Sequence, residues 1–144
     1  MSNVEKTRVH PETGATLVRG VRTVVLTFRS QIEAVEMPGW YPVGDTTADH
    51  GVHEAKDMQV SDRAINTMKA REIGVMTPIE VRSVRKKLKI SQRDAGRFIG
   101  GGPNAFQKYE SGDVVLSKAA DTALRLLSND PKRLNELLSE QHMA

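Results

Sequence analysis

Three polar side chains in the last third of the chain have the spacing of one exposed helical face. Asn104, Gln107 and Lys108 lie three and four residues apart, and residues at that spacing share a side of an α-helix. An asparagine or glutamine amide can pair with adenine through two hydrogen bonds, and a lysine can donate to guanine or to a phosphate. The three residues are therefore candidates for contact with DNA bases.

The residues in front of them predict that this helix is the second of two short ones. Ser91 is a good N-cap, and the apolar residues within 95–99 mark one side of a helix of about two turns. Three glycines at 100–102 end that helix, because glycine accepts the positive φ that a sharp stop needs. Pro103 suits the first turn of the next helix.

Two short helices joined by a glycine turn favour a helix-turn-helix unit, whose second helix lies in the major groove of DNA. In that arrangement Gln92, Arg93 and Arg97 of the first helix are expected to contact phosphates. An ordinary helical hairpin with a polar outer face stays open as an alternative, because helix-turn-helix shapes also occur outside DNA-binding proteins.

Charge is distributed unevenly over the 144 residues. Residues 80–110 carry eight lysine or arginine side chains and three carboxylates, whereas residues 33–62 carry seven carboxylates and one lysine. The first segment suits contact with a polyanion and the second suits a basic partner. Two solvated faces are the alternative interpretation.

Composition excludes several classes of protein. The sequence contains no cysteine, so it can form neither a disulfide framework nor a thiolate metal site. No apolar run approaches the roughly 20 residues that a membrane-spanning helix needs, and residues 1–6 lack the apolar core of a signal peptide. We expect a soluble, cytoplasmic protein.

No catalytic, metal or cofactor site is expected. His50 and His53 lie near Asp45 and Asp49, but that segment lacks the periodicity of an element that would fix metal ligands. No serine stands in a motif that would pair it with a base, and residues 100–103 lack the Gly-Lys-Ser/Thr of a phosphate-binding loop. We therefore predict that the protein is not an enzyme.

Residues 15–37 have the β-branched content of strands. Gly20 and residues 29–31 are the expected turns, which predicts a small antiparallel sheet of two or three strands. The aromatic segment 38–42 is expected to close the sheet as a rigid turn. Within it, Trp40 is either a core residue or an anchor for a partner.

Helices are predicted over most of the remaining chain. Residues 43–60 lack periodicity and are predicted to form a loop, followed by a helix over 63–73. A capping box over 77–80 begins the next helix, and the last two helices begin after Ser117 and at 130–131.

The helix that begins at Pro78 is predicted to be amphipathic. Its buried side is expected to comprise Ile79, Val81, Val84 and Leu88. Its outer side carries a basic stripe, suited to a phosphate backbone, of Arg82, Arg85, Lys86 and Lys89.

These elements predict an α+β fold, in which a small N-terminal antiparallel β-sheet region precedes a five-helix C-terminal bundle. We expect a β-rich domain over 1–60, a linker helix over 61–76 and a DNA-binding and dimerisation domain over 77–144. Surplus leucines near the end of the chain cover the bundle or form the seam of a homodimer, and a homodimer suits a palindromic operator.

The run from Val81 to Gly112 resembles the MqsA (YgiT) family of antitoxins, which carry an XRE-type helix-turn-helix domain in their C-terminal half. The specific part is Gly-Gly-Gly-x-Asn-Ala-Phe-x-(Arg/Lys)-Tyr-Glu-x-Gly, matched by residues 100–112. Residues 35–41 are also similar to the family's N-terminal half. The resemblance implies that Asn104 and Lys108 contact bases.

The resemblance further implies a transcriptional repressor from a type II toxin–antitoxin module. Such a protein dimerises through its C-terminal domain, binds a palindrome in its own promoter and neutralises a toxin through its N-terminal domain. The alternative is a stand-alone XRE-type regulator whose N-terminal half senses a ligand or another protein.

The chain departs from the family in its N-terminal half. Family members commonly hold a structural zinc there with two Cys-x-x-Cys pairs, and the regions around 9–13 and 39–41 contain no cysteine. Either Trp40, Phe28 and the valines hold the sheet together instead, or this half is poorly ordered.

Overall fold

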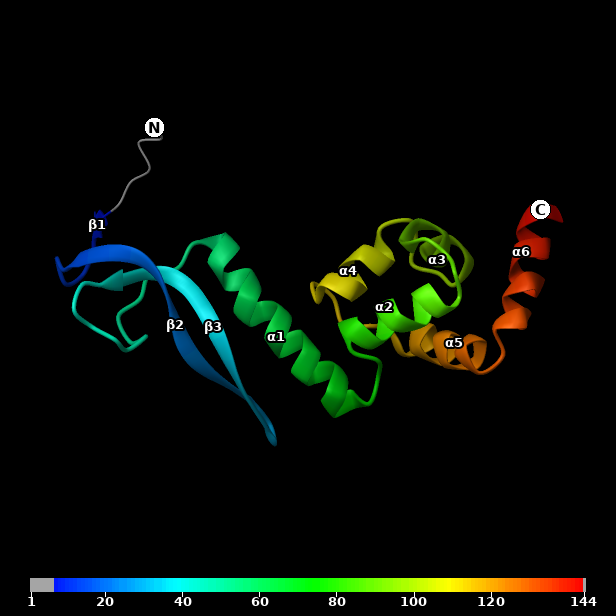
Figure 1. Cartoon of the computed structure of the whole chain (residues 1–144), viewed down its shortest axis with the longest axis horizontal. Coiled ribbons are helices and arrows are strands. Elements are labelled where there is room, and N and C mark those ends of the chain that lie inside the picture. The colour runs from blue at the N-terminus through cyan, green and yellow to red at the C-terminus, as the bar shows by residue number, and fades with distance from the viewer. Residues whose placement is uncertain (1–6, 144) are drawn as a thin grey trace. The chain divides into compact units, whose positions relative to one another are not determined.

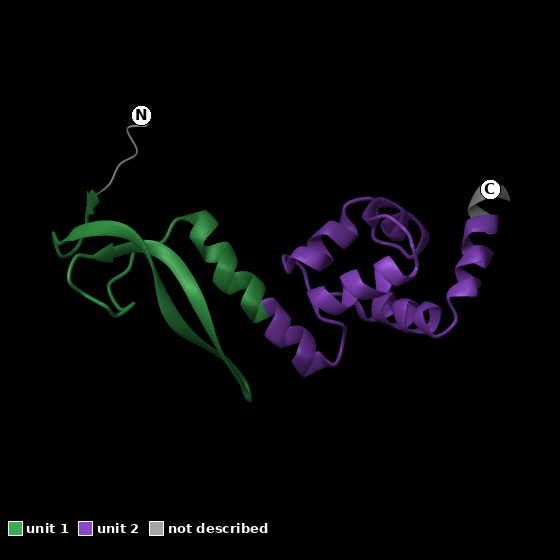
Figure 2. Ribbon diagram, viewed as in Figure 1, with its two compact units in different colours: residues 1–65 green, residues 66–144 purple. Residues whose placement is uncertain are grey.

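The computed structural model describes residues 7–143 (Figure 1). The segment 1–6, from which the expectation about a signal peptide was drawn, lies outside this range. An antiparallel sheet precedes the helices, so the predicted α+β class is confirmed. The chain divides into two compact units, residues 1–65 and 66–144 (Figure 2).

The sheet of the first unit has the strand order β1-β2-β3. β1 (Thr7–Val9) pairs only with the first three residues of β2 (Thr16–Phe28). β2 and β3 (Gln31–Pro42) pair along their whole length, from Leu17 opposite Pro42 to Phe28 opposite Gln31. A two-stranded ribbon therefore continues beyond β1, as Figure 1 shows.

Two expected turns are wrong. Gly20 lies inside β2, opposite Gly39, and the segment 38–42 is the last part of β3. Glycine at position 39 permits a close approach, since a Cβ there would lie 2.7 Å from Nδ1 of His53. The backbone hydrogen bonds between Trp40 and Val52, 2.9 and 2.8 Å long, hold the same region in an extended conformation.

The sheet is held together at the end that β1 covers. Leu17, Met37, Trp40 and Tyr41 are at most 4% exposed, and the Tyr41 hydroxyl donates a 2.6 Å hydrogen bond to the Met37 carbonyl. Of the two alternatives for Trp40, its burial confirms the core residue. Phe28 and the valines do not form this core: Phe28 is half-buried near the far end of the ribbon, and Val21 and Val25 are 49% and 62% exposed.

Helix α1 (Ala55–Ile73) begins at Ala55, earlier than the predicted start at Arg63. The Asp57 carboxylate accepts a 2.9 Å hydrogen bond from the Glu54 amide and so caps the first turn. Ser61, an expected cap, lies inside the helix, where its hydroxyl donates to the Met58 carbonyl.

The second unit contains the later helices of the described chain. α2 (Pro78–Lys87) begins with the predicted Thr77–Glu80 capping box, and α5 (Lys118–Asn129) begins after the predicted N-cap Ser117. Between them lie α3 (Gln92–Phe98) and α4 (Ala105–Ser111). A 3-10 turn (Pro131–Arg133) precedes α6 (Leu134–Met143).

The core of the second unit is apolar. Val81, Ala95, Phe106 and Leu124 are completely buried and come from four different helices. The expectation that Ile79 is buried is wrong. Its side chain is 83% exposed, because Ile79 lies two residues before the completely buried Val81 and so faces the opposite side of α2.

Polar contacts fix the segment between α1 and α2. The carboxylate of Asp121, which is 6% exposed, accepts a 2.8 Å hydrogen bond from the Met76 amide. Arg125 pairs with Asp121 and also donates to the Gly74 carbonyl at 3.3 Å.

None of the helices within residues 7–143 combines the length and the apolar character that crossing a bilayer requires.

Candidate functional site

The short helices α3 and α4 and the break between them are present as predicted. The Ser91 hydroxyl accepts a 3.0 Å hydrogen bond from the Asp94 amide at the start of α3. Gly100, Gly101 and Gly102 all have positive φ, between 90° and 127°, which glycine adopts without strain.

The start of α4 differs from the prediction. The helix begins at Ala105 after the N-cap Asn104, so Pro103 lies in the turn and not in the first helical turn. The glycine turn runs two residues longer than predicted, and a 3.3 Å hydrogen bond from the Ala105 amide to the Gly102 carbonyl closes it.

Gly96 in α3 is a structural requirement that sequence reasoning missed. It is buried, and a Cβ at this position would lie 1.8 Å from the Gly102 carbonyl oxygen. The backbone of α3 therefore touches the backbone of the turn that leads into α4. A glycine inside a predicted helix is the sequence signal for such a close approach.

The three candidate base-contacting residues are exposed together at the N-terminal end of α4. Asn104, Gln107 and Lys108 all have exposed side chains. Phe106, on the opposite side of the helix, is completely buried and packs edge to face against Tyr109, with ring centroids 5.4 Å apart. The predicted polar face of this helix is present.

Two surface hollows divide these residues into groups. Asn104 and Lys108 line one hollow together with Gly101 and Tyr109. The second hollow is lined by residues of α2, α3 and α4, namely Arg82, Arg85, Gln92, Gln107, Glu110 and Ser111. The structure thus brings Gln107, a candidate for base contact, beside Gln92, a candidate for phosphate contact.

The other two candidates for phosphate contact are on α3. Arg93 and Arg97 are exposed and lie one helical turn apart. Neither lines the two hollows just described. Their guanidinium groups are available to solvent near the start and the end of the helix.

Arg85 does not belong to the basic stripe predicted for α2. Its Nε and Nη2 atoms donate to both carboxylate oxygens of Glu110 at 2.7 and 2.9 Å, and Nη1 donates to the Ile90 carbonyl at 3.0 Å. The Arg85 and Glu110 side chains are 13% and 5% exposed. The hydrogen bonds to Glu110 raise the pKa of Arg85 above its ordinary value.

The Arg85–Glu110 pair joins α2 to α4 and so orients the candidate DNA-contacting helix. Sequence reasoning missed it, because the two residues are 25 positions apart and no periodicity relates them. A second contact holds the end of α4: the Asn66 side-chain amide donates to the carbonyls of Gly112 and Asp113 at 2.8 and 3.2 Å.

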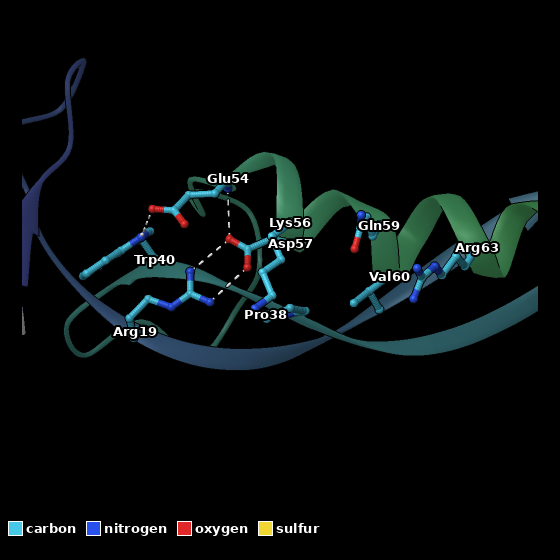
Figure 3. Close-up of a pocket in the computed structure, with 9 residues that line it drawn as sticks. All are labelled: Arg19, Pro38, Trp40, Glu54, Lys56, Asp57, Gln59, Val60 and Arg63. Atoms are coloured by element: carbon cyan, nitrogen blue, oxygen red, sulfur yellow. Dashed lines mark hydrogen bonds and ion pairs between the residues drawn. The ribbon is translucent and has the colours of Figure 1, made fainter. Parts of the chain in front are cut away.

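A polar cluster surrounds Trp40 in the first unit (Figure 3). The guanidinium carbons of Arg8 and Arg19 lie 4.2 and 5.4 Å from the centroid of the Trp40 ring. Arg19 also donates two 2.9 Å hydrogen bonds to Asp57, and Arg8 pairs with Glu54 at 3.0 Å. The hydrogen bonds from Arg19 lower the pKa of Asp57 to about 2.

His10 and His53 of the first unit both hydrogen-bond to backbone groups. Nδ1 of His10 accepts hydrogen bonds from the amides of Glu12 and Thr13, 3.1 and 3.2 Å long, and so closes the turn between β1 and β2. Nδ1 of His53 lies 2.9 Å from the Pro38 carbonyl. Within the described part of the chain, no three His, Asp or Glu side chains are grouped so as to hold a metal.

Residues 10–138 match the model of a family described as the antitoxin component of bacterial toxin–antitoxin systems, MqsA. The chain is also 30% identical to Antitoxin MqsA of Escherichia coli (strain K12) in an alignment of 126 residues that covers 84% of this chain and 92% of that protein. Both matches extend over most of the first unit and most of the second.

Proposed function

Because the chain belongs to the MqsA family of antitoxins, we propose that it is the antitoxin of a type II toxin–antitoxin module. In this role it neutralises a toxin and represses transcription of its own operon, and it acts in the cytoplasm, where that DNA is found. Membership of the family supports the toxin partner, and the geometry of α3 and α4 supports the contact with DNA.

In the proposed complex, α3 and α4 act as a helix-turn-helix and α4 enters the major groove. Asn104, Gln107 and Lys108 contact base edges. Gln92, Arg93 and Arg97 contact phosphates and fix the register of the protein on the duplex. The observation that carries this proposal is the exposure of the three side chains at the start of α4 while Phe106 anchors its other side.

A homodimer completes the proposal. Leu126 on α5 is 64% exposed, and it lines an apolar hollow together with Ala123, Leu127 and Leu137. A second copy seated on this surface would remove the leucine from water and double the number of helices available to DNA. Two symmetric copies suit a palindromic operator.

The first unit is the proposed toxin-binding part. Its segment 33–62 carries seven carboxylates, of which Asp57 is buried and paired with Arg19 and Glu54 is paired with Arg8. The other five give the segment an acidic character that favours a basic partner. The cluster around Trp40 gives this unit a fixed core on which such a surface can be presented.

DNA binding is tested with the duplex that lies upstream of the protein's own gene. We expect this duplex to bind at least about 1,000-fold more tightly than a scrambled duplex at physiological salt, measured by fluorescence anisotropy. Both affinities should fall as salt rises, because bound cations are released from the phosphates. Equal affinity for the two duplexes would refute sequence-specific repression.

Neutralisation is tested by expressing the product of the adjacent gene with and without this chain. We expect the adjacent product to stop growth when it is expressed alone, and co-expression of the chain to restore growth. An adjacent product that is harmless, together with specific DNA binding, would favour the stand-alone regulator instead.

A further inference from the structure

A hollow of about 380 Å³ lies beside α4, and Asn104 and Lys108 both line it. Its other side chains are mostly apolar. They come from the turn before α4, from α4 itself and from the loop after it, namely Pro103, Ala105, Tyr109 and Val114. Asn104 and Lys108 are residues that we propose to contact base edges. In the proposed complex the hollow therefore opens toward the bases.

Glycine keeps this hollow open at position 101. Its φ of +97° lies in the left-handed region, and a Cβ there would lie 2.7 Å from the Cβ of Ala105 and 3.6 Å from the hydroxyl oxygen of Tyr109. Any larger residue would fill the space next to these two side chains. Because position 101 has no side chain, the methyl group of Ala105 remains part of the wall of the hollow.

Val114 adds an exposed isopropyl group to the same wall. Its side chain is 44% exposed, although its loop is fixed by hydrogen bonds. The Asn66 side-chain amide holds the carbonyls of Gly112 and Asp113. The Val114 amide itself donates a 3.3 Å hydrogen bond to the Lys108 carbonyl. An apolar group is thus held in place beside a residue that is proposed to contact bases.

The chemistry of the major groove limits what this apolar wall can meet there. The four unmodified bases present hydrogen-bond donors and acceptors in the groove, and the C5-methyl group of thymine is the one apolar group that they display. Only that methyl group can bury the side chain of Val114 without leaving a polar base atom against it. Asn104 favours adenine, so a thymine is present in the same base pair, and another can occupy the next one.

We propose that this hollow reads thymine. The C5-methyl group of a thymine, within one base pair of the adenine that Asn104 contacts, packs against Val114 and Ala105. Val114 then determines specificity from outside α4. This inference rests on the proposed repressor function and names a base that each half of its operator contains.

The first test removes only the methyl group from the DNA. Each thymine of the duplex upstream of the protein's own gene is replaced in turn by deoxyuridine, which pairs with adenine in the same way, and affinity is measured by fluorescence anisotropy. One thymine in each half-site should show a loss of about fourfold, the size expected for burying one methyl group. Replacing the thymine in both half-sites should weaken binding about 15-fold.

The second test changes the wall of the hollow in the full-length chain. In Val114→Ala, the loss caused by deoxyuridine at that thymine should shrink to less than about twofold, because the methyl group has lost its partner. Val114 is exposed, so folding should be unaffected. The matched control is Val25→Ala, on a valine of the first unit that is 62% exposed, and this variant should keep the full effect of deoxyuridine.

A third measurement locates the thymine without depending on affinity. 5-Iodouracil at the same position carries iodine where the methyl group was, and ultraviolet light joins it to residues in contact, aromatic ones above all. Tyr109 lines the hollow, and trypsin, which cuts after Lys108 and Lys118, leaves Tyr109 and Val114 in one peptide, 109–118. The crosslink should lie in this peptide. A crosslink found only elsewhere in the chain would overturn the contact with Val114.

The outcomes separate this inference from the function on which it rests. The chain could prefer its operator over scrambled DNA while deoxyuridine leaves the affinity unchanged at every position, or while deoxyuridine acts equally on Val114→Ala. Either result refutes the thymine contact and leaves the repressor function standing. If operator and scrambled duplex bind alike, the repressor function fails and the inference fails with it.

Discussion

At the scale of single residues, the Arg85–Glu110 pair determines how firmly α4 is held. Removing one partner leaves the other as a buried charge without a counter-charge, which costs about 3–5 kcal/mol. We expect Glu110→Gln to lower the free energy of unfolding by about 3 kcal/mol, measured by urea denaturation. The double variant Arg85→Met/Glu110→Met should lose much less than the sum of the single variants, and strict additivity would contradict this account.

The division between base and phosphate contacts is tested at Asn104 and Arg93. Asn104→Ala should weaken binding to the operator by about 1–3 kcal/mol and leave binding to random DNA almost unchanged. Arg93→Ala should weaken both equally and reduce the slope of log affinity against log salt by about 1. The same loss from both variants on both duplexes would remove the distinction.

The pKa of Asp57 gives the first unit an acid-sensitive contact. Its folded value of about 2 lies below the ordinary 3.8, so the contribution to stability is complete above about pH 4 and is lost as the pH falls toward 2. Trp40, the single tryptophan, should report this loss by fluorescence. Asp57→Asn should be less stable at neutral pH and should show a flatter change between pH 4 and pH 2.

Residue-scale expectations succeeded where a side chain's environment depends on its own helix. The exposure of Gln107 and the burial of Phe106 follow from spacing alone. The roles of Arg85 and Asp57 depend on partners 25 and 38 residues away, which no local pattern specifies. The sequence therefore predicted the polar face of α4 but not the contacts that position it.

At the scale of elements, the close approach of α3 to its turn makes Gly96 hard to replace. Alanine usually stabilises a helix relative to glycine by about 1 kcal/mol. Here the added methyl group would meet the Gly102 carbonyl oxygen, so we expect Gly96→Ala to destabilise the chain by about 1–3 kcal/mol and to weaken DNA binding. Arg97→Ala, on an exposed residue of the same helix, should change thermal stability little, and a stabilised Gly96→Ala would contradict the geometry.

Helix starts were easier to predict than strand ends. The capping residues Thr77, Ser91 and Ser117 act within their own turn, so their sequence context is sufficient. The segment 38–42 looks like a turn because it contains two prolines and a glycine. It is a strand because β2 supplies a partner along its whole length, and strand pairing is not encoded locally.

At the scale of the whole molecule, the proposed homodimer is tested at the apolar surface of α5. Leu126→Glu places a charge where a second copy would seat. Because Leu126 is exposed, folding of the single chain should be unaffected. We expect a shift from dimer to monomer in sedimentation velocity at micromolar concentration, with operator affinity reduced at least about 10-fold. A variant that stays dimeric would place the seam elsewhere.

The match to the MqsA family covers residues 10–138 and so reaches both units, but the sequence predicted the second unit better than the first. The first unit contains none of the cysteines that the resemblance led us to expect there. Its turn at His10 is closed by hydrogen bonds to a ring nitrogen, and its sheet is packed around Trp40 and Tyr41. The turn at His10 is local, but the packing around Trp40 and Tyr41 joins strands and helix residues far apart in sequence, such as Arg19 and Asp57, so it was visible only in the folded chain.

The tethering of the segment 74–77 by Asp121 and Arg125 has a consequence for how the chain is degraded. Proteases cut backbone that can leave its surroundings and extend across an active site. Val75 and Met76 are buried and the Met76 amide is bonded, so this connection is a poor substrate despite its glycine. Most residues at 43–47 are exposed, so we expect the first cut in this loop and survival of the helical half after it.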